Sequence, residues 1–160
     1  MTDSDVIDTL NDLIETCKDG EYGFKTCAEQ ASAPLLKTAL ERRAESCRAA
    51  AAELQTEVVS LGGSPETGGS TAGAVHRGWV AVRAKLSSFD DLAVLKECER
   101  GEDAALDSYH DALKSELPPR IRALVEAQCK GAQRNHEQIR TLRDTLSAAA
   151  QEEPRRSASS

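Results

Sequence analysis

Aromatic residues are scarce in this chain of 160 residues, which has one Trp, two Tyr and two Phe. β-branched residues are also few, whereas Ala, Leu, Glu and Arg are abundant. A β-sheet or an aromatic core is therefore not expected. The composition is typical of helices that pack closely through small side chains, and the length suffices for one domain with a buried core.

Long apolar runs are also missing, and no stretch approaches the ~20 consecutive apolar residues that span a bilayer. The first five residues are polar and acidic and lack the basic and apolar segments of a secretory signal, so we expect a cytoplasmic protein. The formal net charge of -7 gives the chain no electrostatic attraction to nucleic acid or to anionic lipid. Neither nucleic acid nor a membrane is therefore expected as a partner.

The common signatures of phosphate binding, of nucleophilic catalysis and of cysteine-ligated zinc are likewise absent from the sequence. It contains no phosphate-binding Gly-rich loop, no nucleophile elbow and no Cys-x-x-Cys pair. The five cysteines, which we expect to be reduced and buried, are Cys17, Cys27, Cys47, Cys98 and Cys129. Because Cys17 and Cys47 fall nearly level on neighbouring predicted helices, a thiol pair that senses oxidation is the alternative.

Apolar periodicity predicts four long helices and one short helix. The long helices are expected at 3–31, 34–61, 89–116 and 119–149, and the short one at 74–87. Thr2 with Asp5, and Ser88 with Asp91, form candidate capping boxes at two helix starts. Gly62 suits the left-handed position that follows the second helix.

The connection lengths predict how the helices are arranged. Tight turns join the first helix to the second and the third to the fourth, so the members of each pair should be antiparallel. Residues 62–88 separate the pairs and can return along the whole bundle. The sequence therefore predicts an all-α, up-down four-helix bundle with a long crossover that carries the short helix. Residues 1–149 form the single domain, and 150–160 are expected to be a disordered tail.

Polar residues on the apolar helix stripes are the candidate site. A helix rises ~1.5 Å per residue, so residues equidistant from a tight turn lie at the same height. With the crossover, all four helices place polar stripe residues at one height. This predicted polar layer consists of Glu21, Arg43, Glu99, Glu102, Gln133 and His136. Buried charges need a partner or a metal, so the layer predicts either ion pairs that fix helix register or a metal site.

Several phrases of the sequence resemble those of a known superfamily. They are Leu61-Gly-Gly-x-Pro65, Gly69-Ser-x-x-Gly73-x-x-His76-Arg77-x-Trp79, Cys98-Glu-x-Gly-Glu-Asp103, Leu117-Pro118 and Gln133-x-x-His136-x-x-Ile139-x-x-Leu142-Arg-Asp144. With the predicted topology, the chain resembles ferritin-like four-helix bundles of the bacterioferritin and rubrerythrin type. More narrowly, it resembles an uncharacterised bacterial branch that is known as a domain of unknown function. The resemblance spans roughly residues 5–146 and implies a ferritin-like fold.

The resemblance also implies where metal ligands would lie. Ferritin-like di-iron sites take one Glu from each of two helices and a Glu-x-x-His pair from each of the other two. Glu21 and Glu102 match the single-Glu positions, and Gln133-x-x-His136 matches one pair with Gln in place of Glu. The second helix has no His and places Arg43 at the metal height, so the di-iron site is degenerate. Glu21, Glu102 and His136 could still hold a single iron, manganese or zinc ion.

Three functions remain open from the sequence. The preferred one is a self-associating ferritin-like bundle, a homo-oligomer such as a dimer, with a structural or weakly metal-binding core, no catalytic residues and no required cofactor. Its stress-related role is implied by the resemblance alone. The alternatives are a metal-dependent oxidase or ferroxidase of rubrerythrin type, and a helical interaction module that uses His76, Arg77 and Trp79 on the short helix.

Overall fold

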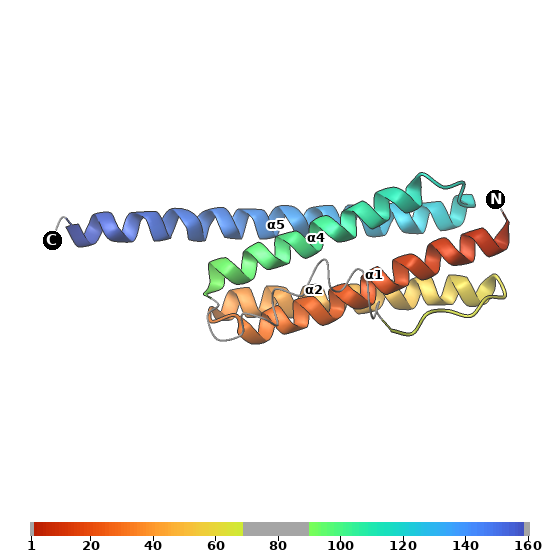
Figure 1. Cartoon of the computed structure of the whole chain (residues 1–160), viewed down its shortest axis with the longest axis horizontal. Helices are drawn as coiled ribbons and strands as arrows, with labels where there is room; N and C mark the ends of the chain where they lie inside the picture. The colour runs from red at the N-terminus through yellow and green to blue at the C-terminus, as the bar shows by residue number, and fades with distance from the viewer. Residues whose placement is uncertain (1, 69–89, 159–160) are drawn as a thin grey trace.

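The structure is a computed structural model that describes residues 2–68 and 90–158, with side chains to residue 149. Its four helices are α1 (Asp3–Gln30), α2 (Pro34–Ser60), α4 (Asp91–Leu113) and α5 (Pro119–Ala158) (Figure 1). The described residues form no strand, so the all-α prediction is confirmed. The predicted short helix at 74–87, with His76, Arg77 and Trp79, lies outside the described residues. Across these two ranges, none of the helices combines the length and apolar character needed to cross a bilayer.

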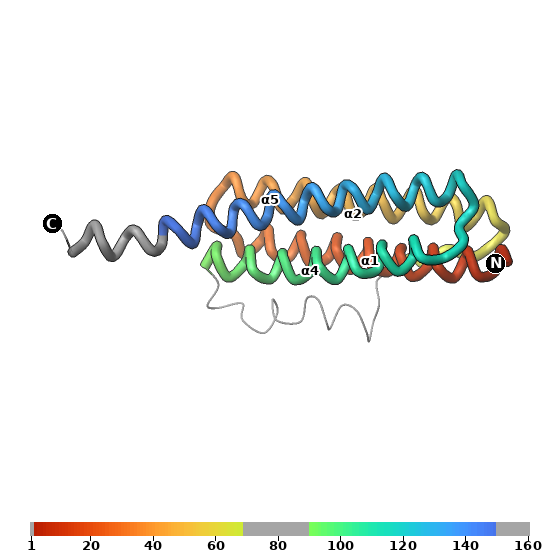
Figure 2. Tube along the Cα trace, turned by 90° about the horizontal axis from the view of Figure 1, so that it is seen from above, coloured from red at the N-terminus to blue at the C-terminus, as the bar shows by residue number. Residues whose placement is uncertain are grey.

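The helices form an up-down bundle in which α2 and α4 run in the same direction. Figures 1 and 2 show α1 antiparallel to α2 and α4 antiparallel to α5, with α2 ending at one end of the bundle and α4 starting at the other. The chain must therefore return along the bundle between them, as the sequence predicted. This topology places residues that are far apart in the sequence at the same height.

Local sequence explains where α1 and α2 begin and end. Thr2 and Asp5 form the predicted capping box at the start of α1. At the end of α2, Gly62 has a φ of 83°, in the left-handed region that glycine adopts without steric cost. The amides of Gly62 and Gly63 donate to the carbonyls of Val59 and Val58 at 2.9 and 3.0 Å, respectively. Both hydrogen bonds satisfy carbonyls that would otherwise be unpaired at the helix end.

The start of α4 differs from its prediction. Asp90, not Ser88, is the N-cap residue, and its carboxylate accepts from the Ala93 amide at 2.8 Å. Asp91 accepts from the Ser32 and Ala33 amides at 2.7 and 3.0 Å, which ties the start of α4 to the α1–α2 turn. The capping prediction failed because four candidate acceptors lie within five residues here, at 87, 88, 90 and 91. Spacing alone does not choose among them.

Replacing Asp91 with alanine is expected to lower the free energy of unfolding by about 1–2 kcal/mol, because two backbone amides lose their acceptor. Urea unfolding of the variant measures this loss. Asp111 provides a matched control, since its only described partner is the exposed Lys114 and its replacement should change stability little. Equal stability of the Asp91→Ala variant and the wild type would contradict the proposed role.

Helix α5 is longer than expected, because it continues to Ala158 and not to residue 149. Its sequence stays rich in good helix formers beyond that point, with Ala at 148–150 followed by Gln and two Glu. Side chains from residue 150 onward lie outside the described part. The assignment of 150–160 to a tail separate from the domain therefore stays a prediction.

Two hydrophobic clusters form the core. The first joins the N-terminal halves of α1 and α5 to the C-terminal halves of α2 and α4, and its large buried members include Leu10, Leu13, Ile14, Leu54, Tyr109 and Val125. The second occupies the other end of the bundle and includes Phe24, Leu36, Leu40, Leu95 and Ile139. Each fully buried side chain of this size contributes about 1.5–3 kcal/mol through removal of apolar surface from water. The candidate site lies where the two clusters meet.

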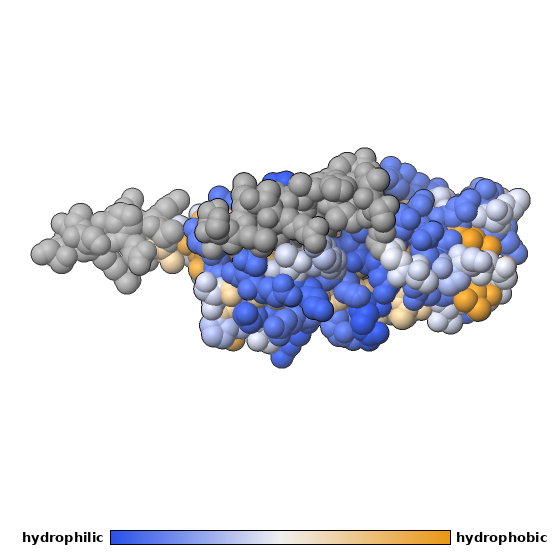
Figure 3. Space-filling view, turned by 60° about the horizontal axis from the view of Figure 1, so that its bottom comes forward, coloured by the Kyte–Doolittle hydropathy of each residue, from blue (hydrophilic) through white to orange (hydrophobic). Residues whose placement is uncertain are grey.

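Small residues bring α1 and α2 close together at that junction. A Cβ atom added to Gly20 would lie 2.9 Å from Cys47 Sγ, so the glycine is required for the observed spacing. Outside the core, Figure 3 shows a mostly hydrophilic face, with hydrophobic atoms gathered toward the end of the bundle opposite the C-terminus. The exposed Val59 lies in the last turn of α2.

Candidate functional site

A buried ion pair between Arg43 of α2 and Glu102 of α4 is the centre of the site. Arg43 donates from Nε and Nη2 to Glu102 Oε1 at 3.1 and 2.8 Å. The Glu102 side chain is 0% exposed and the Arg43 side chain 12%. The Arg43 guanidinium carbon also lies 5.4 Å from the centroid of the Phe24 ring, within the range of a cation–π contact. Parallel α2 and α4 place both residues at the same height.

Burial and pairing act against each other on this carboxyl group. Burial raises the pKa of Glu102 above its ordinary value, while Arg43, Asn135 and His136 favour the ionised form and partly oppose that rise. For Arg43, burial alone would lower the pKa, but the neighbouring Cys47 and Glu102 raise it above its ordinary value. The guanidinium therefore stays charged. The cost of removing the carboxylate from water is not fully recovered by its partners.

Tyr109 of α4 extends the polar site toward α1 and α5. Its hydroxyl donates to Gln128 Oε1 at 3.0 Å and lies 3.3 Å from Cys17 Sγ. Gln128 in turn donates to the Ala50 carbonyl at 3.2 Å, which connects the network to α2. Burial raises the pKa of Tyr109 well above its ordinary value, so the phenol stays protonated and acts as a hydrogen-bond donor.

A small cavity of about 40 Å³ adjoins the pair. Its lining combines the polar groups of the site with small residues of α1 and α4, and includes Cys17, Gly20, Cys47, Gly101, Glu102 and Tyr109. This volume is of the order of one water molecule. The cavity is therefore too small for an organic substrate, and it does not identify an active site.

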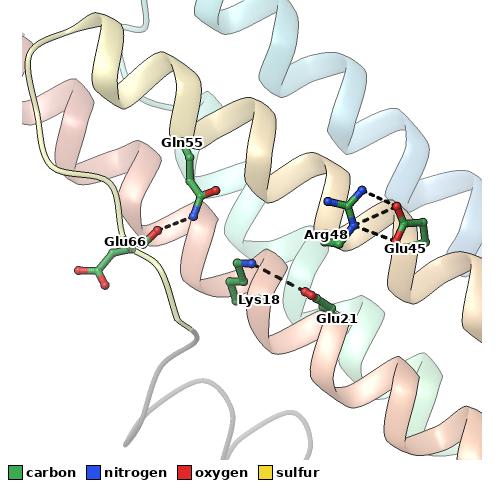
Figure 4. A network of polar contacts seen from close by, with 6 residues as sticks. All are labelled: Lys18, Glu21, Glu45, Arg48, Gln55 and Glu66. Carbon is green, nitrogen blue, oxygen red and sulfur yellow. Dashed lines mark hydrogen bonds and ion pairs between the residues drawn. The ribbon is translucent and has the colours of Figure 1, made fainter.

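The structure separates Glu21 from Arg43 and Glu102. Glu21 Oε1 lies 3.8 Å from Lys18 Nζ on the same helix, and both side chains are about a quarter exposed. Figure 4 shows Glu21 facing Lys18, while Glu45 of α2 faces Arg48. The same view shows Gln55, which donates to the Glu66 carbonyl at 2.7 Å and holds the first part of the crossover against α2. Glu21 is thus a surface residue of the α1–α2 side.

The remaining predicted residues make their direct contacts outside the central pair, although His136 is close enough to favour the ionised form of Glu102. Glu99 forms an ion pair with Arg143 of α5. His136 Nε2 lies 2.6 Å from Asp103 Oδ1, although this contact lacks hydrogen-bond geometry, and the Gln133 side chain is exposed. The structure therefore pairs Arg43 with Glu102, whereas Glu21, Glu99 and His136 face other charged partners and Gln133 is exposed.

These residues do not fit a ferritin-like metal centre. Among residues 2–68 and 90–149, no group of three or more His, Cys, Asp or Glu side chains could hold a metal ion. Glu21, Glu102 and His136 in particular do not converge on one point. The guanidinium of Arg43 bonds the fully buried Glu102 carboxylate, and an arginine cannot lose its charge to admit a cation.

The cysteines are buried thiols with little nucleophilic character. None of the five cysteines forms a disulfide, and all five are buried. Burial raises the pKa of Cys47 to about 12 and raises the pKa values of Cys17, Cys98 and Cys129. Cys17 also contacts the Tyr109 hydroxyl and so belongs to the polar network that Tyr109 forms.

We expect these thiols to react slowly with a disulfide reagent in the native protein. A pKa of about 12 leaves about one Cys47 side chain in 10⁴ ionised at pH 8, and burial blocks the reagent. The time course at pH 8, with the urea-unfolded protein as a control, measures this protection. Fast reaction of Cys17 or Cys47 in the native state would support an oxidation sensor instead.

Sequence reasoning missed several members of the site. Tyr109 is not a member of the predicted polar layer, although its place seven residues after Glu102 on one helix face could have suggested a shared polar network. Asn135 was not singled out, yet it favours ionised Glu102. The buried Glu97, which accepts from Arg100 at 2.9 Å, was also missed, because its position carries no distinctive spacing.

The described helices have the fold of a ferritin-like four-helix bundle. Solved structures support this class. A dodecameric thioferritin, the bacterioferritin-related protein from Bacteroides fragilis, matches with a TM-score of 0.73 at 16% identity, covering 96% of this chain and 91% of that chain. A Dps1 mutant from Mycobacterium smegmatis matches with a TM-score of 0.70 at 18% identity, covering 88% of this chain and 96% of that chain.

The chain belongs to the family described as Domain of unknown function (DUF2383), which matches residues 5–115. This agrees with the resemblance noted from the sequence. A second Mycobacterium smegmatis structure, Dps in a tetragonal form, matches with a TM-score of 0.69 at 19% identity and covers 88% of each chain. Similarity at this level establishes the fold. No curated protein sequence matches the chain.

Proposed function

We propose that this protein is a non-catalytic ferritin-like bundle in which an ion pair between Arg43 and Glu102 takes the place of a metal centre. The observation that carries the proposal is the pair of hydrogen bonds from Arg43 to the fully buried Glu102. A metal at this height would lie beside a permanent positive charge and would lose its carboxylate ligand. The role of the pair is to fix the register of α2 against α4.

Iron(II) oxidation in air tests this proposal against a metal-dependent oxidase or ferroxidase. The wild type should oxidise iron(II) no faster than buffer, and addition of manganese or zinc should leave its thermal unfolding unchanged. Glu21→Ala and His136→Ala are suitable variants because both side chains are partly exposed and outside the core clusters. Oxidation by the wild type that either variant abolishes would replace the proposal with a metal site.

Self-association is the second part of the proposed function. The matching thioferritin is described as dodecameric, which supports a homo-oligomer, and the dimer expected from the sequence is the simplest form. A stress-related role rests on the family resemblance alone. Light scattering of the wild type and of Trp79→Ala measures the oligomer. A change in size on this substitution would favour an interaction module that uses the predicted short helix.

A further inference from the structure

Two buried thiols from different helices are in contact within the second hydrophobic cluster. Cys27 of α1 is 1% exposed and Cys98 of α4 is 0% exposed, and both belong to that cluster. Burial raises the pKa of Cys98 well above its ordinary value, and a hydrogen bond with the Cys27 thiol raises it further. The two sulfur atoms therefore face each other across the interface between α1 and α4.

The register of the two helices accounts for this contact. Asp91 accepts from the Ser32 amide at 2.7 Å, so the start of α4 lies beside the end of α1. Cys27 lies five residues before Ser32 and Cys98 seven residues after Asp91, and Figure 1 shows the two helices antiparallel. A rise of ~1.5 Å per residue then puts the two cysteines within about 3 Å of the same height. The backbone arrangement itself thus brings the two thiols together.

The other three cysteines, which also lie in the described part of the chain, have different surroundings. Cys17 and Cys47 line the same small cavity beside the central ion pair, but the hydrogen-bond partner of Cys17 is the Tyr109 hydroxyl at 3.3 Å. Cys129 belongs to the first cluster and lies on α5. The pair between α1 and α4 is thus distinguished by a direct contact of two thiols.

We propose that Cys27 and Cys98 form a reversible disulfide when the protein is exposed to a peroxide. An S–S bond length of about 2.05 Å requires two contacting sulfur atoms to move only a little closer. The bond would join the α1–α2 pair to the α4–α5 pair on one side of the bundle, while on the other side α2 and α5 pack least closely among the neighbouring helices. It would also close a loop of roughly 70 residues, and a cross-link over such a length restricts the unfolded chain strongly.

The oxidation consists of two successive displacements. One thiol attacks a peroxide oxygen as its thiolate, so an S–O bond forms, the O–O bond breaks, and with hydrogen peroxide the released hydroxide takes up the thiol proton as water. The second thiol attacks the sulfur of the resulting sulfenic acid, so the S–S bond forms, the S–O bond breaks and a second water leaves. The two sulfur atoms together lose two electrons, which the peroxide gains. Because the second step is intramolecular, it competes well with further oxidation of the sulfenic acid.

Burial of the pair sets the rate of this reaction but does not prevent it. Both thiols are shielded from a bulky disulfide reagent, whereas hydrogen peroxide is little larger than water. Cys98 lies about two turns into α4, near one end of the bundle, where local opening requires less free energy than global unfolding. Slow formation of the disulfide in the folded protein, and slow reduction by an added thiol, are therefore expected.

Peptide mapping of the full chain after treatment with hydrogen peroxide tests the proposal, because lysine and arginine place each of the five cysteines on a separate tryptic peptide. After alkylation of the remaining thiols, the main linked product should join residues 26–37 to residues 97–100. The disulfide should raise the urea midpoint by about 1 M, and dithiothreitol should reverse both changes. Cys98→Ala should abolish both, whereas Cys129→Ala, a matched change of a buried cysteine outside the pair, should leave both as in the wild type.

Three results would overturn the proposal. The first is the absence of this linked product in the folded wild type under conditions that oxidise the urea-unfolded protein completely. The second is a main product that joins Cys17 to Cys47, which would place the redox-active pair at the central cavity. The third is an unchanged or lower urea midpoint of the oxidised protein, which would show that the cross-link does not suit the native packing of α1 against α4.

Discussion

Replacing Arg43 with leucine is expected to lower the free energy of unfolding by about 3–5 kcal/mol at pH 7, because it leaves the buried Glu102 carboxylate without its main partner. The Glu102 side chain is 0% exposed, so its carboxylate has no contact with water. Urea unfolding followed by circular dichroism measures the loss. Arg48→Leu is the control on the same helix, since the Arg48–Glu45 pair is largely exposed and should contribute little.

The same variant should show a distinctive pH dependence. Arg43 lowers the pKa of Glu102 in the native protein, so its removal raises that pKa further above the ordinary value for a carboxyl group. A carboxyl whose folded-state pKa is raised favours folding at low pH, and this contribution disappears as pH rises through the folded-state pKa. The deficit of Arg43→Leu relative to the wild type should therefore shrink on acidification from pH 8 toward pH 5. A loss below about 1 kcal/mol, or one independent of pH, would contradict the buried pairing.

Replacing both partners should reverse most of that loss. Arg43→Leu combined with Glu102→Leu removes the buried charge together with its partner, and such exchanges are often neutral or stabilising by about 1–4 kcal/mol. Since burial already raises the pKa of Glu102 despite the nearby arginine, the pair recovers only part of its desolvation cost. The double variant should therefore unfold near or above the wild-type urea midpoint.

A thermodynamic cycle with both single variants isolates the interaction between the two side chains. A coupling energy of several kcal/mol is expected, because each single substitution leaves the other charged side chain buried without its partner. Additive losses would mean that the residues contribute independently, and that the pair does not fix the register of α2 against α4. The Phe24 ring near Arg43 offers some compensation to the arginine alone, so Glu102→Leu should cost less than Arg43→Leu.

The fold could be predicted from the sequence because its signals are local. Thr2 with Asp5 marks the start of α1, and Gly62 marks the end of α2. The long connection required the chain to return along the bundle, which set α2 parallel to α4 and brought Arg43 level with Glu102. The competing acceptors at residues 88–91 were beyond such reasoning, because the choice depends on Asp91 binding the distant α1–α2 turn.

The site could be predicted only in part, because helical rise fixes height but not rotation. Glu21 stands at the right height, yet it faces Lys18 because α1 turns Gly20 and Gly23 toward the core. Hydrophobic patterns overlook glycine, although Gly20 permits the close approach of Cys47. The prediction for Glu99 was wrong for the same reason, because its side chain pairs with Arg143 outside the central pair. A rotation of one residue, about 100° on a helix, separates a core ligand from a surface residue.

Leu142 shows a further limit of sequence periodicity. Its spacing of three residues from the buried Ile139 favours a core position, but the Leu142 side chain is 37% exposed. Helix separation depends on side chains from both helices, and no single-helix pattern reports it.

Elemental analysis of the untagged protein, purified in air and under anaerobic conditions, tests the central claim most directly. With Arg43 bonded to Glu102 in place of a metal, iron, manganese and zinc should be far below one ion per chain and should not rise after incubation with each metal and gel filtration. About one ion per chain would contradict the account, and about two irons per chain would indicate a di-iron centre built from a ligand set other than the one considered.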